Sequence, residues 1–146
     1  MTQPEDNPYL EKIRQSAYNS GYFRLLDMHL EEARDGVGAT HIDVDNRLMH
    51  AQKIVHGGVI FTLADTAMSM ALLSVLPEGS RVSTIEAKIN YLLPVRGGEL
   101  TSEATIVHRG NRTAVVEATV YNVNGEERKA IARVLGTFNI QHPKIS

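Results

Sequence analysis

The stretch from His56 to Leu76 constrains this chain more than any other, because it predicts a helix that is apolar on nearly every side. It begins with one histidine and two glycines and is long enough for about five helical turns. A helix that is hydrophobic all round has to be buried on most of its surface. The rest of the chain, or a second copy of it, must therefore cover this helix from more than one side.

One stripe of the predicted helix is polar. Its members recur at spacings of three and four residues and so share one face: Thr62, Asp65, Thr66 and Ser69. Asp65 carries the only charge in the helix. Because an unpaired buried carboxylate is costly, we expect Asp65 either to be satisfied by nearby donors or to be retained for chemistry.

The composition excludes several classes of function. A length of 146 residues suits one domain, and a formal net charge of −2 offers no basic field for nucleic acid. The absence of cysteine excludes disulfides, a thiol nucleophile and cysteine-ligated zinc. The histidines have no spacing typical of metal ligands, so we expect neither a metal nor a nucleic-acid partner.

The N-terminal segment is polar and acidic and has no apolar signal-peptide region, which predicts a cytoplasmic protein. Only the central helix is long enough to be considered as a membrane span. It contains Asp65, two threonines and two serines, and alternating strands follow it, so we expect no membrane partner.

The segment before this helix predicts a helical arm, residues 1–27, followed by two strands. Asn7 is expected to cap the first helix, with Pro8 in its first position. An Asp35-Gly36 turn is expected between the strands. The predicted elements are a helix over Asn7–Asn19, a helical turn over Tyr22–Leu26, and strands over Met28–Ala33 and Val37–Val44.

Four alternating runs after the helix predict antiparallel strands: Arg81–Leu92, Glu99–His108, Thr113–Asn122 and Lys129–Ile140. Asn124-Gly125 predicts a type I′ hairpin turn between the last two. The expected fold class is α+β, a twisted antiparallel sheet with one buried helix on it, in a single domain over residues 1–146. One sheet covers only one side of a helix and has open edges, so we predict a homodimer.

Gly57 and Gly58 begin the predicted helix, where free backbone N–H groups and the helix dipole favour an oxyanion or a polarised carbonyl. The same glycines would also suit a tight entry turn without a ligand. Gly57 and Asp65 lie about 12 Å apart along one helix axis, too far to touch one carbonyl together. Two antiparallel helices from two subunits could bring such groups together.

The segment HGGVIFTLADTA, residues 56–67, resembles the signature of the hotdog-fold acyl-CoA thioesterases. The similarity extends from about Tyr22 to Phe138 and is closest to the phenylacetate-degradation type within the 4-hydroxybenzoyl-CoA thioesterase superfamily. It implies a hotdog fold, in which an antiparallel sheet wraps a long helix. It also implies hydrolysis of an acyl-CoA substrate to free acid and CoA, without a separate cofactor, by homodimers that often pair again into tetramers.

The resemblance also implies roles for residues. The Gly57 amide would polarise the thioester carbonyl, Asp65 of the facing subunit would act as nucleophile or base, and Thr84 would position water. Substrate would further be bound by the helix start, His56 and Gly58, with His56 bracing the loop. The CoA phosphates would lie near the turn formed by Arg109, Gly110, Asn111 and Arg112.

Two positions depart from the family pattern. Many members have an asparagine six residues before the histidine of the signature and a glycine three residues before it, where this chain has His50 and Lys53. His50 can donate a hydrogen bond and titrate near neutrality, so we expect it to assist catalysis. The same departure leaves open a non-catalytic acyl-CoA-binding module. Lys53 either contacts a CoA phosphate or is a solvated loop lysine.

Overall fold

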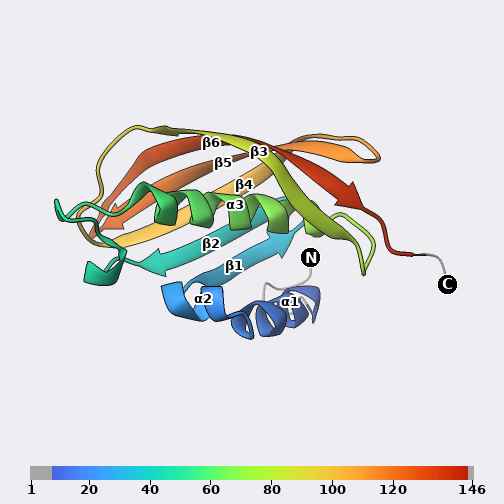
Figure 1. The fold of residues 1–146 in the computed structure, drawn as a ribbon, viewed down its shortest axis with the longest axis horizontal. Coiled ribbons are helices and arrows are strands. Elements are labelled where there is room, and N and C mark those ends of the chain that lie inside the picture. The colour runs from blue at the N-terminus through green and yellow to red at the C-terminus, as the bar shows by residue number, and fades with distance from the viewer. Residues whose placement is uncertain (1–7, 145–146) are drawn as a thin grey trace.

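Helix α3 (Gly57–Leu73) lies against a curved antiparallel sheet in the computed structural model, which describes residues 8–144 (Figure 1). The sheet has six strands in the order β1-β2-β4-β5-β6-β3, and every strand is antiparallel to its neighbours. Helix α3 contacts all six strands. The predicted α+β hotdog architecture is therefore confirmed.

The predicted elements are present, with their ends shifted by a few residues. Their bounds are α1 Pro8–Tyr18, α2 Gly21–Leu26, β1 His29–Arg34, β2 Val37–Asp43, a 3₁₀ turn at Asn46–Leu48, β3 Arg81–Tyr91, β4 Glu99–Arg109, β5 Thr113–Asn124 and β6 Glu127–Gln141. The predicted cap Asn7 lies outside the described residues. None of the described helices is both long and apolar enough to cross a membrane.

Helix α3 ends at Leu73, earlier than the apolar run predicted. The Ser74 hydroxyl donates to the Ala71 carbonyl at 2.7 Å and accepts the Gly36 N–H at 2.9 Å, which ties the helix end to the β1–β2 turn. Leu76 is nevertheless buried, at 9% exposure. The apolar run continued to Leu76 because it reports burial, and burial persists after the helical conformation has ended.

The N-terminal arm and the sheet cover different sides of α3. In the arm, Leu10 packs with Leu30 and Ala33 of β1, and the partly buried Met70 of α3 joins this cluster. The Tyr9 hydroxyl donates to the Leu73 carbonyl at 3.0 Å. The arm therefore contributes part of the second cover that the apolar helix required.

Of the two predicted hairpin turns, one is confirmed and the other has a different turn type. The Asp35-Gly36 turn is confirmed, with φ of 52° and 81° at its two central residues, as a type I′ turn requires. The hairpin near Asn124 exists, but the predicted type I′ turn is wrong. Asn124 pairs with Glu127, so the turn is Gly125-Glu126 with positive φ only at Gly125, which fits type II′. The buried faces of β5 and β6 set this register, and the turn follows it.

Strand β3 also departs from simple alternation. Regular alternation along Arg81–Leu92 would place Ile85 on one face with Ala87 and Ile89, but Ile85 is 57% exposed. Thr84 pairs with Phe138 and Glu86 with Thr137, so Ile85 is an extra residue in a β-bulge. The extra residue shifts the inward–outward alternation of side chains by one position, so the residues before and after the bulge follow opposite patterns.

The contact between α3 and β2 is close because of Gly38. A Cβ added at Gly38 would lie 2.0 Å from the Ala67 carbonyl oxygen and 2.6 Å from the Ala71 nitrogen. Both contacts are with helix backbone, which cannot move aside as a flexible side chain can. Only glycine therefore fits where the helix crosses this strand.

The loop between β2 and α3 contains a residue in a strained conformation. Met49 and Val55 form an isolated antiparallel bridge, and the Lys53 N–H donates to the His50 carbonyl at 3.0 Å. Lys53 has φ of 65°, in the left-handed region that favours glycine. This is the position where the resembled family often has glycine, and its backbone geometry explains that preference.

Gly38→Ala should destabilise the protein by about 3 kcal/mol. Overpacking a core typically costs about 1–3 kcal/mol, and a clash with fixed backbone belongs at the upper end of that range. Gly97→Ala is the matched control, because a Cβ at Gly97 would meet nothing within 4 Å. Urea unfolding of the two variants measures the difference. Equal midpoints for the two variants would contradict the close helix–strand contact.

Lys53→Gly should stabilise the protein by about 0.5–1 kcal/mol. Glycine removes the strain energy of the left-handed backbone, and this gain exceeds the cost of the greater entropy that glycine gives the unfolded chain. Lys53→Ala removes the same charged side chain but retains the left-handed strain, so its stability should match the wild type. Thermal and urea unfolding check both variants, and an equal gain in Lys53→Ala would show that charge, and not backbone, is responsible.

Candidate active site

The start of helix α3 is held by His56. The His56 side chain accepts the Gly58 N–H through Nδ1 at 2.8 Å. The backbone N–H of His56 donates to the Leu48 carbonyl at 2.8 Å. Among the bonds of residues 8–144, none uses the Gly57 N–H as donor. The helix therefore begins with one capped amide and one amide that is available to an incoming group.

A pocket of about 310 Å³ opens beside Gly57. Most of its walls are aliphatic, and its polar edge includes His50, Tyr91 and the Gly57 backbone. Its lining residues are His50, Ile54, Val55, Gly57, Ile60, Tyr91, Leu92, Leu93, Pro94 and Val95. A mainly apolar pocket with a few polar groups at one edge is typical of a site for a small organic ligand.

His50 lies at this pocket because of the short hairpin that precedes α3. Its Nδ1 accepts the Gln52 N–H at 3.1 Å. In the neutral ring the proton is then on Nε2, which makes Nε2 a hydrogen-bond donor. The structure thus brings His50 and Gly57 to one pocket.

Asp65 lies farther along α3 and contacts Thr84 of strand β3. The Thr84 hydroxyl donates to the Asp65 carboxylate at 2.6 Å, and the Ser69 hydroxyl donates to the Asp65 carbonyl at 3.0 Å. Thr84 directly precedes the bulged Ile85, and bulges often re-aim side chains beside functional sites. The structure therefore brings together the acid and the hydroxyl that the resemblance pairs.

Gly57 and Asp65 do not meet within one protomer. Both belong to the continuous helix α3, which separates them by about 12 Å along its axis. Gly57 lies at the pocket and Asp65 is absent from the pocket lining. One protomer therefore holds the Gly57 amide and the Asp65–Thr84 pair at separate points of α3, both beside strand β3.

The turn Arg109–Arg112 lies at the opposite end of α3 from Gly57. Arg109 Nη1 donates to the Val75 carbonyl at 3.2 Å, and the Gly110 N–H donates to the Thr113 carbonyl at 2.8 Å. The Asn111 carbonyl accepts His142 Nε2–H at 2.7 Å. Both arginines are exposed, so their charges are available to a ligand from outside this protomer.

Two tyrosines contact the start of α3 without having been singled out in the sequence. The Tyr91 hydroxyl donates to the Gly57 carbonyl at 2.7 Å. The Tyr22 hydroxyl lies 2.6 Å from Thr62 Oγ1, and Thr62 itself donates to the Gly58 carbonyl. An aromatic residue at a strand end is visible in a sequence, but its hydrogen-bond partner is not.

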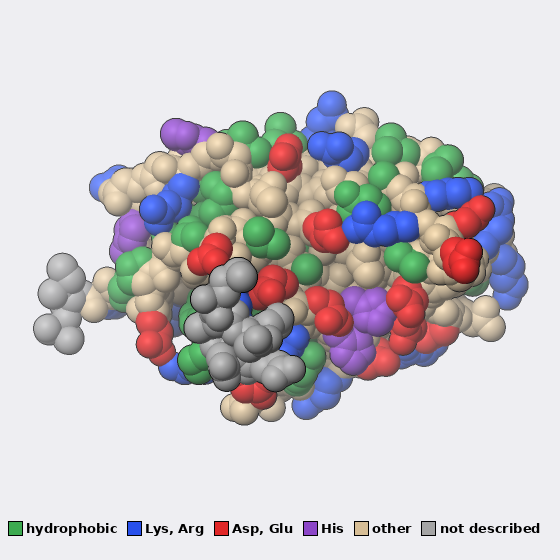
Figure 2. Space-filling view, turned by 180° about the vertical axis from the view of Figure 1, so that it is seen from behind, with side chains coloured by type: hydrophobic (Ala, Val, Ile, Leu, Met, Phe, Trp, Pro, Cys, Tyr) green, Lys and Arg blue, Asp and Glu red, His purple; other side chains and the backbone are tan. Residues whose placement is uncertain are grey.

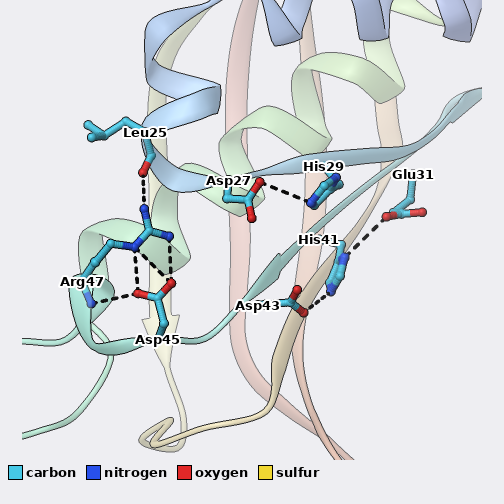
Figure 3. Close-up of polar contacts among 8 residues, drawn as sticks. All are labelled: Leu25, Asp27, His29, Glu31, His41, Asp43, Asp45 and Arg47. Carbon is cyan, nitrogen blue, oxygen red and sulfur yellow. Dashed lines mark hydrogen bonds and ion pairs between the residues drawn. The ribbon is translucent and has the colours of Figure 1, made fainter.

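A cluster of histidines and acids lies on the outer face of β1, β2 and β4 (Figure 3). His41 Nε2 lies 3.1 Å from Asp43 and 3.7 Å from Glu99, while Nδ1 lies 3.5 Å from Glu31. Figure 2 shows histidine side chains gathered among acidic ones on this face. His41, Asp43 and Glu99 could hold a cation. The sequence did not indicate this set, because strand pairing brings Glu99 opposite Asp43.

Comparisons with known proteins identify the family of this chain. The family model of the thioesterase superfamily matches residues 52–129, more than half of the chain. A candidate esterase from Archaeoglobus fulgidus is 33% identical over 130 residues, which are 88% of this chain and 80% of that protein.

A second relative has a more specific name. The medium/long-chain acyl-CoA thioesterase YigI of Escherichia coli is 30% identical over 103 residues, 62% of this chain and 64% of that protein. Among solved structures, a thioesterase family protein from Silicibacter pomeroyi superposes with a TM-score of 0.85 at 27% identity, covering 92% of this chain and 98% of that one. The chain therefore belongs to the thioesterase superfamily and is a thioester hydrolase of the hotdog fold.

Proposed function

We propose that this protein hydrolyses acyl-CoA thioesters to the free acid and CoA, at sites formed between two head-to-tail protomers. The observation that carries the proposal is the pair of half-sites on α3, an available Gly57 amide beside an apolar pocket and an Asp65–Thr84 pair elsewhere. Neither half holds both an oxyanion donor and an acid. The name of the Escherichia coli relative supports acyl-CoA as the substrate class.

The Gly57 half would bind the acyl group and the thioester carbonyl. The aliphatic pocket accepts the acyl chain, and the Gly57 N–H donates to the carbonyl oxygen as negative charge develops on it. The positive end of the helix dipole favours that charge further. His50, at the edge of the same pocket, offers a second donor through Nε2–H.

The Asp65 half, from the facing protomer, would supply the attacking group. As a base, Asp65 takes a proton from water while the water oxygen bonds to the carbonyl carbon. The intermediate then expels the CoA thiolate, which receives that proton. As a nucleophile, the carboxylate would form an anhydride with the acyl group as the thioester C–S bond breaks and the CoA thiolate leaves. Water would then hydrolyse the anhydride, which releases the acid, regenerates the Asp65 carboxylate and supplies the proton that the thiolate takes up. Thr84 fixes the orientation of the carboxylate in both routes. Neither route requires a cofactor besides the CoA of the substrate.

The surface of the protomer supports a homodimer. Strand β3 is an edge strand, and its exposed apolar residue Ile85 lies close to Thr84 and Asp65. A second copy pairing at this edge would cover Ile85 and bring its own helix start toward Asp65. In a head-to-tail dimer, Arg109 and Arg112 of one protomer would approach the helix start of the other, where the CoA phosphates would extend.

Two finer assignments belong to the same proposal. The signature from His56 to Asp65 favours the phenylacetate-degradation branch of the superfamily. Leu135 of β6, which pairs with Lys88 of β3, and Val107 of β4 are exposed and offer further apolar surface for a dimer of dimers.

Asp65→Asn should lower kcat by about 10²–10⁴-fold, because an amide neither accepts the proton of water nor attacks the carbonyl. Its size and its bond from Thr84 are preserved, so the protein should remain folded. Release of free CoA thiol across aryl-, short- and long-chain acyl-CoAs measures the effect, with Glu117→Gln as the control for loss of one carboxylate. Near-normal turnover by Asp65→Asn would refute the role of Asp65.

Mixed dimers test the shared site. Gly57→Ala should inactivate the helix start, since a Cβ there would lie 2.9 Å from the Tyr91 hydroxyl oxygen. When Gly57→Ala and Asp65→Asn chains are refolded together, mixed dimers regain one intact site, which should restore about a quarter of wild-type activity in a symmetric dimer. Size-exclusion chromatography verifies the assembly. If the mixture is no more active than its two components, each site is confined to one protomer.

A further inference from the structure

Tyr91 lies against the start of helix α3 from the end of the neighbouring strand. Its backbone pairs with Ala132 of β6, which fixes the point from which the side chain extends. A Cβ added at Gly57 would lie 2.9 Å from the Tyr91 hydroxyl oxygen and 3.0 Å from ring carbon Cζ. The first glycine of the helix therefore leaves room for this ring.

The peptide group that joins Gly57 to Gly58 is held at both ends. Its carbonyl oxygen accepts the Tyr91 hydroxyl at 2.7 Å, and its N–H is accepted by His56 Nδ1 at 2.8 Å. Glycine backbones have wide rotational freedom, so two consecutive glycines would otherwise form a loose helix start. The preceding peptide, which carries the Gly57 N–H, is held through its carbonyl, because the His56 carbonyl accepts the Val59 N–H at 3.0 Å. With both peptides held, the direction of the Gly57 N–H is fixed.

We infer that Tyr91 is a positioning residue, which orients the Gly57 N–H toward the pocket for the thioester carbonyl. The inference deepens the proposed function and rests on it. A donor that is aimed before the substrate arrives stabilises an oxyanion without reorganisation, whereas a mobile donor loses part of that stabilisation. Tyr91 acts through the Gly57 peptide, and its effect is expected on the chemical step.

Tyr91 as a whole is 50% exposed, but partial burial still raises the pKa of its hydroxyl above the usual range. The group then stays protonated at neutral and mildly alkaline pH and continues to donate to the Gly57 carbonyl. The Tyr91 hydroxyl should therefore contribute equally to turnover from about pH 6 to about pH 9.

The opposite end of α3 provides a matched control. The Tyr9 hydroxyl donates to the Leu73 carbonyl at 3.0 Å, so Tyr9→Phe removes a tyrosine-to-backbone bond from the same helix. Tyr9 does not line the pocket beside Gly57. The two phenylalanine variants thus lose the same kind of bond at the two ends of one helix.

Tyr91→Phe should lower kcat by about 10-fold, while KM changes less than about two-fold. The loss in kcat is smaller than the loss of about 10²–10³-fold that follows removal of a whole oxyanion donor, because the Gly57 N–H itself remains. Tyr9→Phe should keep wild-type kcat, and urea unfolding should show similar small losses of stability in both. The ratio of wild-type to Tyr91→Phe kcat should be constant across pH 6 to 9. Equal kcat in the two variants would overturn the inference and assign Tyr91 a structural role only.

A second measurement separates this inference from the proposed function. If the wild type hydrolyses no acyl-CoA, the proposed function fails, and the amide NMR signals of Gly57 and Gly58 then decide the role of Tyr91. Tyr91→Phe should shift the Gly57 amide resonance and speed hydrogen exchange at Gly58, while Tyr9→Phe leaves both unchanged. Unchanged signals in Tyr91→Phe would overturn the positioning role regardless of substrate.

Discussion

The close packing of helix α3 on strand β2 determines most of the rest of the structure. Ala64, Ala67 and Ala71 are fully buried, and Gly38 places no side chain between strand and helix. Packed interiors tolerate little extra volume, so this contact leaves the helix almost no freedom to slide or rotate. Because Gly57 begins the same helix, the contact also fixes where the free amide lies relative to the sheet.

The polar stripe of α3 shows how one carboxylate is retained in a largely apolar helix. Thr62 and Ser69 donate to carbonyls of their own helix, so neither hydroxyl needs water. Asp65 receives the Thr84 hydroxyl on one oxygen, and no other side-chain donor to its carboxylate occurs in the described part of the chain. Asp65 is only partly buried, so its second oxygen stays open to water or to a ligand, which suits a base or a nucleophile.

Sequence patterns predicted the elements of this fold because apolar periodicity reports burial. Periodicity does not report backbone conformation, and this explains the errors. Burial continues past Leu73, where the helix ends, and the bulge at Ile85 interrupts the alternation of β3. For the site, the polar stripe singled out Asp65, and the resemblance added Thr84. The Tyr91 bond and the left-handed Lys53 were out of reach, because both depend on register and loop geometry that only the folded chain defines.

The departure from the family pattern at His50 changes a pocket-lining side chain, and not where the helix begins. The helix start is placed by the bond from the His56 N–H to the Leu48 carbonyl and by the neighbouring Met49–Val55 bridge. Neither interaction uses the side chain of residue 50. His50 has Nδ1 occupied by the Gln52 amide and lines the pocket with its ring. Imidazole in place of an amide at this position therefore leaves the Gly57 amide in position and places a hydrogen-bond donor, Nε2–H, on a side chain that lines the pocket.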